Sequence, residues 1–279
     1  MHKPSPVHKK QRPAAGAARF LLLATATLAA PALAQDGRAE RTPDGNPNLN
    51  GIWQAVGTAH WNLEGHAAEA GPVVNMGALG AIPAGLGVVE GGQIPYQAWA
   101  LERRLQNKAD WLKLDPVVKC YMPGVPRATY MPFPFQIVQT PDHILFAYEF
   151  ASASRVVYMD RPDFEHPADA WMGHSLGRWE GETLVIDVTN HVPDTWLDSA
   201  GNFHSAALRV EERYRRKGPD HLLYEATIED PEVYTRPWKI SLPLYRRIDE
   251  NMQLLEFKCV EFVEEMMYGH LRKKDAEEE

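Results

Sequence analysis

The chain has 279 residues, of which 44% are hydrophobic and 24% charged, and its formal net charge is −8. These fractions are typical of a soluble globular protein, and they exclude collagen-like and wholly disordered classes. The excess of acidic residues also argues against nucleic acid as a partner, because no surplus of Lys and Arg is left to neutralise phosphates.

The first 34 residues have the layout of a secretory signal peptide. Five Lys and Arg residues precede an apolar run that opens at Phe20 and ends in small residues up to Ala34. The run is shorter than the ~20 apolar residues that span a bilayer, so we expect cleavage after Ala34 and no membrane span afterwards. The mature chain of 279 − 34 = 245 residues would carry a charge of (29 − 5) − 37 = −13 in the periplasm or outside the cell.

Cys120 and Cys259 are the two cysteines of the chain. An even count in an oxidising compartment favours one disulfide between them. A catalytic thiol and a metal pair are the alternatives, but the spacing is not CxxC and an exposed thiol is easily oxidised outside the cytosol. The disulfide would close a loop of about 140 residues and stabilise the fold by roughly 4–5 kcal/mol.

Residues 35–132 are expected to form an N-terminal strap of loops and one helix. Residues 35–50 are rich in Asp, Asn, Gly and Pro, and residues 71–92 hold seven glycines, which is typical of a long loop. Ordered structure is expected to begin at Gly51. The spacing of apolar residues predicts a helix over 96–112. Its expected apolar contacts are Trp99, Leu101, Leu105 and Leu112.

Residues 133–262 change from a helical to an alternating pattern. Short β-branched and aromatic runs are separated by turn residues, and no helix is expected between them. This pattern predicts a mainly β fold, an antiparallel, lipocalin-like β-barrel that could hold one small ligand, followed by a charged tail at 263–279. One pair of expected strands forms a hairpin that bends at 180–181 and returns over 184–188. The other expected strands are 135–140, 144–150, 155–160, 208–216, 222–229, 238–246 and 254–260.

A specific string, GHSLGRWEGETLVID, occupies residues 173–187. Shorter segments accompany it at 43–53, 120–127, 195–198, 204–205, 212–213, 230–238, 254–256 and 259–261. Together they resemble an uncharacterised family of exported bacterial proteins with a GHSxGRWEGxTLVxD motif. The resemblance covers most of the mature chain, and it implies export but no known reaction.

Polar residues gather in the two long loops, 161–173 and 190–205, and in the hairpin between them. His174 and His204 each precede a Ser and flank predicted strands, so we expect both near one barrel mouth. Asp187 lies in an otherwise apolar strand, where it would orient an imidazole and fix its tautomer. The hypothesis is that these three residues are catalytic. The alternative is that the histidines are ordinary loop residues and the carboxylate makes a turn hydrogen bond.

Several tryptophans fall near the predicted barrel ends or the long loops. Core packing explains most aromatic residues, but two or more of these could instead line a site for an aromatic, terpenoid or steroid-like compound. Arginines nearby could pair with a carboxylate on such a ligand or with the many acidic residues of the chain. The predicted substrate-binding residues are Arg178, Trp179, Trp196, Trp171 and Arg155.

Three functions follow as hypotheses. The first is a cofactor-independent enzyme that performs isomerase, lyase or hydrolase chemistry on a small apolar compound. The second is a non-catalytic periplasmic carrier with the same barrel. The third is a metalloenzyme that binds a divalent metal, although no compact spacing such as HExxH supports it. Its ligands would be His166, His174, His204 and Asp198.

Overall fold

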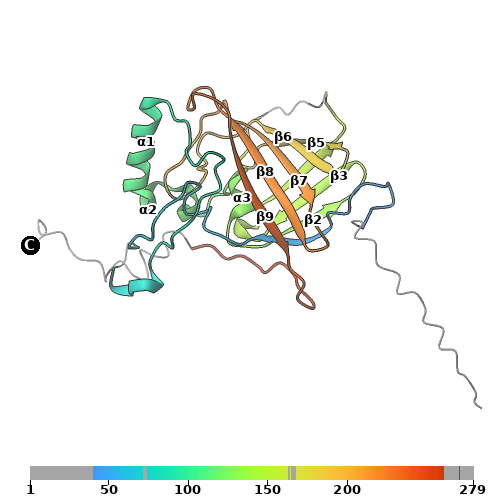
Figure 1. Cartoon of the computed structure of the whole chain (residues 1–279), viewed down its shortest axis with the longest axis horizontal. Coiled ribbons are helices and arrows are strands. Elements are labelled where there is room, and N and C mark those ends of the chain that lie inside the picture. The colour runs from blue at the N-terminus through green and yellow to red at the C-terminus, as the bar shows by residue number, and fades with distance from the viewer. Residues whose placement is uncertain (1–39, 72–73, 163, 165–167, 261–269, 271–279) are drawn as a thin grey trace, which may run out of the picture. The chain divides into compact units, whose positions relative to one another are not determined.

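Nine strands close into a β-barrel in the computed structural model (Figure 1). The structure describes residues 40–71, 74–162, 164, 168–260 and 270, so the predicted signal peptide lies outside the described residues. The described residues all belong to the compact unit Gly37–Glu279. The strands are β1 (Gly51–Ala55), β2 (Phe135–Gln139), β3 (His143–Tyr148), β4 (Ser154–Met159), β5 (His174–Glu180), β6 (Thr183–Thr189), β7 (Arg209–Arg216), β8 (His221–Glu229) and β9 (Trp238–Arg246).

The strand order around the barrel follows the chain order, and β1 pairs with both β2 and β9 to close it. The prediction of a mainly β, closed barrel is therefore confirmed. The prediction that it is antiparallel throughout is wrong at one place, because β4 and β5 pair in parallel, with Val157 opposite Ser175. Parallel neighbours need a long crossover connection, and residues 160–173 supply it.

The ninth strand comes from an unexpected part of the chain. A strand was predicted at 254–260, but these residues form none, and Leu255 and Val260 are 66% and 51% exposed. β1 takes that place instead, within the segment assigned to the strap. It is suited to the barrel because Trp53 and Ala55 alternate inward and are buried, Trp53 at 0% exposure.

Alternation along the strands separates the barrel interior from its outer wall. On β8, for example, Leu222, Tyr224, Ala226 and Ile228 are buried, whereas the residues between them are partly exposed. Large aromatic side chains fill the interior, and burying each one contributes roughly 1.5–3 kcal/mol to folding. The largest of them are Trp53, Tyr130, Tyr214, Tyr224, Phe135 and Phe146.

Short helices accompany the barrel (Figure 1). The α-helices are α1 (Ala98–Ala109), α2 (Trp111–Leu114) and α3 (Arg127–Tyr130), and the 3-10 turns are η1 (Val74–Leu79), η2 (Pro116–Lys119) and η3 (Phe150–Ser152). No helix in the described part of the chain is long and apolar enough to cross a membrane.

Helix α1 confirms the predicted helix in kind, and Trp99 packs against Phe203 with ring centroids 6.1 Å apart, but the expected apolar side chains are not buried. Trp99, Leu101 and Leu105 are each about half exposed, at 52%, 45% and 53%. The backbone of the helix instead lies close to Gly201. A Cβ added to Gly201 would lie 2.6 Å from the carbonyl oxygen of Arg104 in the helix. Such a close approach selects small residues at the contact, so the larger apolar side chains point elsewhere.

Helix α3 is buried at all four of its residues and packs at one end of the barrel. Thr129 Oγ1 lies 3.3 Å from the hydroxyl of Tyr214, an inward residue of β7. Arg127 donates two hydrogen bonds of 2.7 Å to the carboxylate of Asp115, and both side chains are almost fully buried. A bidentate pair of this kind fixes the orientation of α3 relative to the loop before it.

The predicted disulfide is present between Cys120 and Cys259, with their Cα atoms 5.7 Å apart. It fastens the C-terminal segment to the loop that leads into α3. Next to the disulfide, the Phe257 ring packs against those of Phe133 and Phe150, with ring centroids 5.5 and 4.8 Å away. Residues 254–260 are therefore a latch on the barrel rather than one of its strands.

Candidate functional site

The barrel interior contains a buried ion pair. Arg155 on β4 and Glu212 on β7 point inward, and the Nη1 atom of the guanidinium lies 2.6 Å from a carboxylate oxygen. Their side chains are 2% and 0% exposed. The ring of Phe146 covers the guanidinium, whose Cζ atom is 4.6 Å from the ring centroid.

Hydroxyl groups surround this ion pair. Tyr214 and Tyr224 donate to the same carboxylate oxygen at 3.0 and 2.8 Å. The guanidinium donates to the hydroxyl oxygens of Tyr148 at 3.1 Å and Ser175 at 3.2 Å. We call these residues the interior cluster: Arg155, Glu212, Tyr148, Ser175, Tyr214 and Tyr224.

The electrostatics of the interior cluster favour hydrogen-bond donation. Burial raises the pKa of Tyr214 and Tyr224 well above the usual value, and the Glu212 carboxylate raises both further, so the phenols stay protonated. Burial is the largest single effect on the pKa of Arg155 and lowers it, but Glu212, Tyr148 and Tyr214 together raise the pKa well above its usual value. A buried ion pair adds little net stability over apolar packing, so its presence suggests a role beyond packing.

A second group of polar residues lies in the loop between β6 and β7. The Nδ1 atom of His204 is 2.8 Å from the carbonyl oxygen of Ser205, and its Nε2 atom is 2.6 Å from Thr195 Oγ1. A carbonyl oxygen only accepts, so Nδ1 carries the proton of the neutral ring. Nε2 therefore has a lone pair, and Thr195 donates its hydroxyl proton to it.

Asp230 fixes the position of Ser205 in this arrangement. Its two carboxylate oxygens accept from the backbone N–H and the hydroxyl of Ser205, at 2.6 and 2.9 Å. Burial lowers the pKa of His204, while the Ser205 carbonyl and the charge of Asp230 oppose that effect. His204 is thus a neutral imidazole of fixed tautomer, with a carboxylate placed to stabilise it when it gains a proton.

His191 lies beside His204, with ring centroids 5.8 Å apart. It is fully buried, and neither ring nitrogen makes a standard hydrogen bond to a described residue. Burial, together with the nearby His204 and Arg155, lowers the pKa of His191 to about 3, although the backbone of Val188 opposes this effect. Its ring is thus within electrostatic reach of both groups of residues. We call His191, His204 and Thr195 the histidine cluster.

Gly173 shapes the wall against His191. Its φ is +63°, and an added Cβ would lie 2.8 Å from His191 Cε1 and 2.7 Å from Val188 Cγ1. We expect Gly173→Ala to lower the free energy of unfolding by about 2–5 kcal/mol, because backbone strain and overpacking add. Urea unfolding measures this loss.

The matched control for that substitution is Gly181→Ala. Gly181 has a similar φ of +59° but nothing within 4 Å of an added Cβ, so only the backbone cost of about 1–2 kcal/mol is expected. Equal losses in the two variants would show that Gly173 is not packed against His191 as described.

The other two residues predicted to be catalytic lie on the outer wall. Ser175 points inward to Arg155, so its neighbour His174 points outward, where its ring packs near Tyr158 and Phe164 at 5.8 and 5.2 Å. Asp187 also faces outward and forms an ion pair with Arg178. The carboxylate expected to orient a histidine is therefore engaged by a guanidinium, and Asp230 occupies the corresponding position behind His204.

The residues predicted to bind substrate are dispersed. Arg155 belongs to the interior cluster, whereas Arg178 is bound to carboxylates on the outer wall. Trp171 stacks on Tyr121 with ring centroids 4.7 Å apart, and Trp196 is buried within the 190–208 loop. Trp179 is partly buried and packs against the core.

The described residues contain no group of three His, Cys, Asp or Glu side chains that could hold a metal ion. Of the proposed ligands, His166 lies outside the described residues. The carboxylate of Asp198 is engaged in hydrogen bonds within the protein. It accepts from the backbone N–H of Leu63 at 2.8 Å and from the side-chain amide of Asn202 at 2.6 Å. Nothing in this part of the structure supports the metalloenzyme hypothesis.

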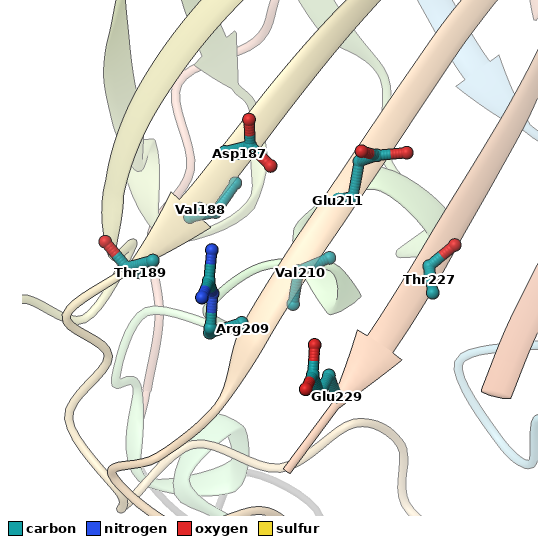
Figure 2. A pocket seen from close by; sticks show the side chains of 8 residues that line it. All are labelled: Asp187, Val188, Thr189, Arg209, Val210, Glu211, Thr227 and Glu229. Atoms are coloured by element: carbon teal, nitrogen blue, oxygen red, sulfur yellow. The ribbon is translucent and has the colours of Figure 1, made fainter. Parts of the chain in front are cut away.

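A groove of about 240 Å³ lies on the outer wall, over the ends of β6, β7 and β8 (Figure 2). Its side chains are mostly polar, and those of Asp187 and Glu211 already pair with Arg178. The barrel wall separates it from the interior cluster, because Glu211 and Glu212 are neighbours on opposite faces of β7. The lining residues are Asp187, Val188, Thr189, Arg209, Val210, Glu211, Thr227 and Glu229.

Sequence reasoning did not single out Thr195, Asp230 or Glu212, and it gave no specific role to His191, which belongs to the polar residues of the 190–205 loop. The first three do lie in segments that resemble the exported family, at 195–198, 230–238 and 212–213. Comparison with known proteins finds no matching family model, no matching curated protein and no matching solved structure. The resemblance therefore stays a prediction.

Proposed function

We propose that this chain is an exported enzyme that performs acid–base chemistry on a small apolar compound, with His204 as the base, in a lipocalin-like barrel. The observation that carries the proposal is the hydrogen-bond chain from Thr195 through His204 to Ser205 and Asp230. A base held in one tautomer by a third group is the arrangement that proton transfer needs.

The interior cluster would bind the polar end of the compound. The Arg155 guanidinium would donate to a carbonyl or carboxylate oxygen of the compound, in exchange for its hydrogen bonds to the hydroxyls of Tyr148 and Ser175. The aromatic side chains of the interior, including Phe135 and Phe146, suit an aromatic, terpenoid or steroid-like body. His191, whose ring lies beside that of His204, would connect the binding centre to the base.

Export is part of the proposal. The Cys120–Cys259 disulfide supports it, because cytosolic thiols are kept reduced. The periplasm or the exterior is thus the proposed place of work, consistent with the basic and apolar start of the sequence.

A carrier without catalysis is the second candidate. The closed barrel favours it, since barrels of this size hold one small ligand among interior side chains. A carrier does not need the paired Thr195 and His204, whereas an enzyme does.

The test is turnover of a panel of apolar esters, lactones, steroids and terpenoids, followed by mass spectrometry. We expect at least one compound to be converted, and His204→Asn to reduce its conversion by about 10²–10⁴-fold. Asparagine can still donate to the Ser205 carbonyl, so the loop is kept while the Nε2 base is removed. The control is His221→Asn, on an exposed position of β8. Equal conversion by His204→Asn would show that His204 is not the base. Binding without any conversion by the native protein would leave the carrier as the answer.

A further inference from the structure

The bonding of His204 determines which atom a substrate meets. Its Nδ1–H is committed to the Ser205 carbonyl, and its Nε2 lone pair accepts the Thr195 hydroxyl at 2.6 Å. A substrate therefore does not reach the base directly. The group next to the base is the Thr195 hydroxyl, from which the base can take a proton.

We propose that Thr195 is the nucleophile of an ester hydrolase, acting on carboxylic esters of apolar acids or alcohols. This inference rests on the proposed function and narrows its three reaction types to one. A hydroxyl within hydrogen-bond reach of an imidazole, which is itself oriented by a third group, is the arrangement of an activated nucleophile.

The reaction follows from these positions. Thr195 Oγ1 bonds to the ester carbonyl carbon while its proton passes to His204 Nε2. The bond from that carbon to the leaving oxygen breaks, and the alcohol departs with the proton from Nε2. Water then attacks the acyl-threonine, gives a proton to Nε2, and releases the carboxylic acid as Oγ1 regains its proton. The net change is ester plus water to acid plus alcohol.

The charges around the pair suit each step. Asp230 is 1% exposed and accepts from the backbone N–H and the hydroxyl of Ser205, so its charge is placed to stabilise the imidazolium that forms. The imidazole is neutral before the reaction, because burial disfavours its charged form. Both conditions are needed for a base that takes up a proton and later returns it.

The segment before α3 covers the nucleophile. Thr195 is 1% exposed, and an added Cβ on Gly124 would lie 2.8 Å from its Oγ1 atom. Gly124 lies between Cys120, which the disulfide holds, and Arg127, which Asp115 holds. The proposal therefore requires residues 121–126 to move between these two anchors when an ester enters.

A fluorophosphonate probe tests the nucleophile directly, because it forms a stable covalent bond with activated hydroxyls. We expect one adduct on the native protein, mapped by peptide mass spectrometry to Thr195. Thr195→Ser should keep the adduct, whereas Thr195→Val and His204→Asn should lose it. Absence of an adduct on the native protein, or an adduct at another residue, overturns the proposal.

Hydrolysis of p-nitrophenyl esters separates failure of this inference from failure of the proposed function. We expect Thr195→Val to lower kcat at least 10³-fold, Thr195→Ser to restore most of it, and the control Thr183→Val to leave it unchanged. Melting temperatures check that each variant folds. If Thr195→Val stays active while His204→Asn does not, Thr195 is not the nucleophile, but the proposal that His204 is the base is retained. If both stay active, both proposals fail.

Discussion

Glu212→Gln is expected to lower the free energy of unfolding by about 3–5 kcal/mol, because it leaves the Arg155 guanidinium buried without its counter-charge. The substituted amide has nearly the volume of the carboxylate, and its oxygen can still accept from Tyr214 and Tyr224. The loss would therefore report the missing charge rather than a cavity. Chemical denaturation followed by tryptophan fluorescence measures it.

Two further variants sharpen that expectation. Arg155→Met combined with Glu212→Gln removes both charges and should recover most of the stability. Glu211→Gln, one residue away on the outer wall, breaks pairs whose carboxylate side chain is 36% exposed and should cost less than about 1 kcal/mol. Similar small effects at positions 211 and 212 would mean that the interior pair is solvated.

The double substitution Cys120→Ser and Cys259→Ser is expected to lower the free energy of unfolding by roughly 4–5 kcal/mol. The bond joins residues 139 positions apart, so removing it frees a long loop in the unfolded chain. The same loss should appear when the native protein is unfolded in the presence of a thiol reductant. Unchanged unfolding in both experiments would show that the disulfide is absent from the exported protein.

Much of the fold could be predicted from local pattern. The alternating runs between 135 and 246 became strands β2 to β9, because side-chain alternation and turn residues act within a few positions. The strand predicted at 254–260 fails because β-branched and aromatic residues also suit an extended latch held by Phe257 and Cys259. Pattern alone cannot tell which extended segment finds a partner strand.

The site was less predictable than the fold. The predicted orienting carboxylate was that of Asp187, whereas the carboxylate that binds Ser205 beside His204 belongs to Asp230, 26 positions after the histidine. Glu212 carried a readable signal, because it interrupts the inward series of Val210 and Tyr214 on β7 with a charge. Its partner Arg155 likewise lies at an inward position of β4. Recognising the pair requires knowing which strands face each other across the barrel.

Composition and residue order by themselves determined the features that depend on neighbours along the chain. These are an acidic globular protein, an export-like start, most of the strands, and a cysteine pair available for a disulfide. The tertiary structure decided what depends on contacts across the chain. It paired β1 with β9, and it placed Thr195 beside His204 and Asp230 beside Ser205. It also turned His174 and Asp187 to the outer wall. The physical reason is that strand register decides whether a side chain points into the barrel or outward, whereas closure of the barrel decides which side chain it contacts.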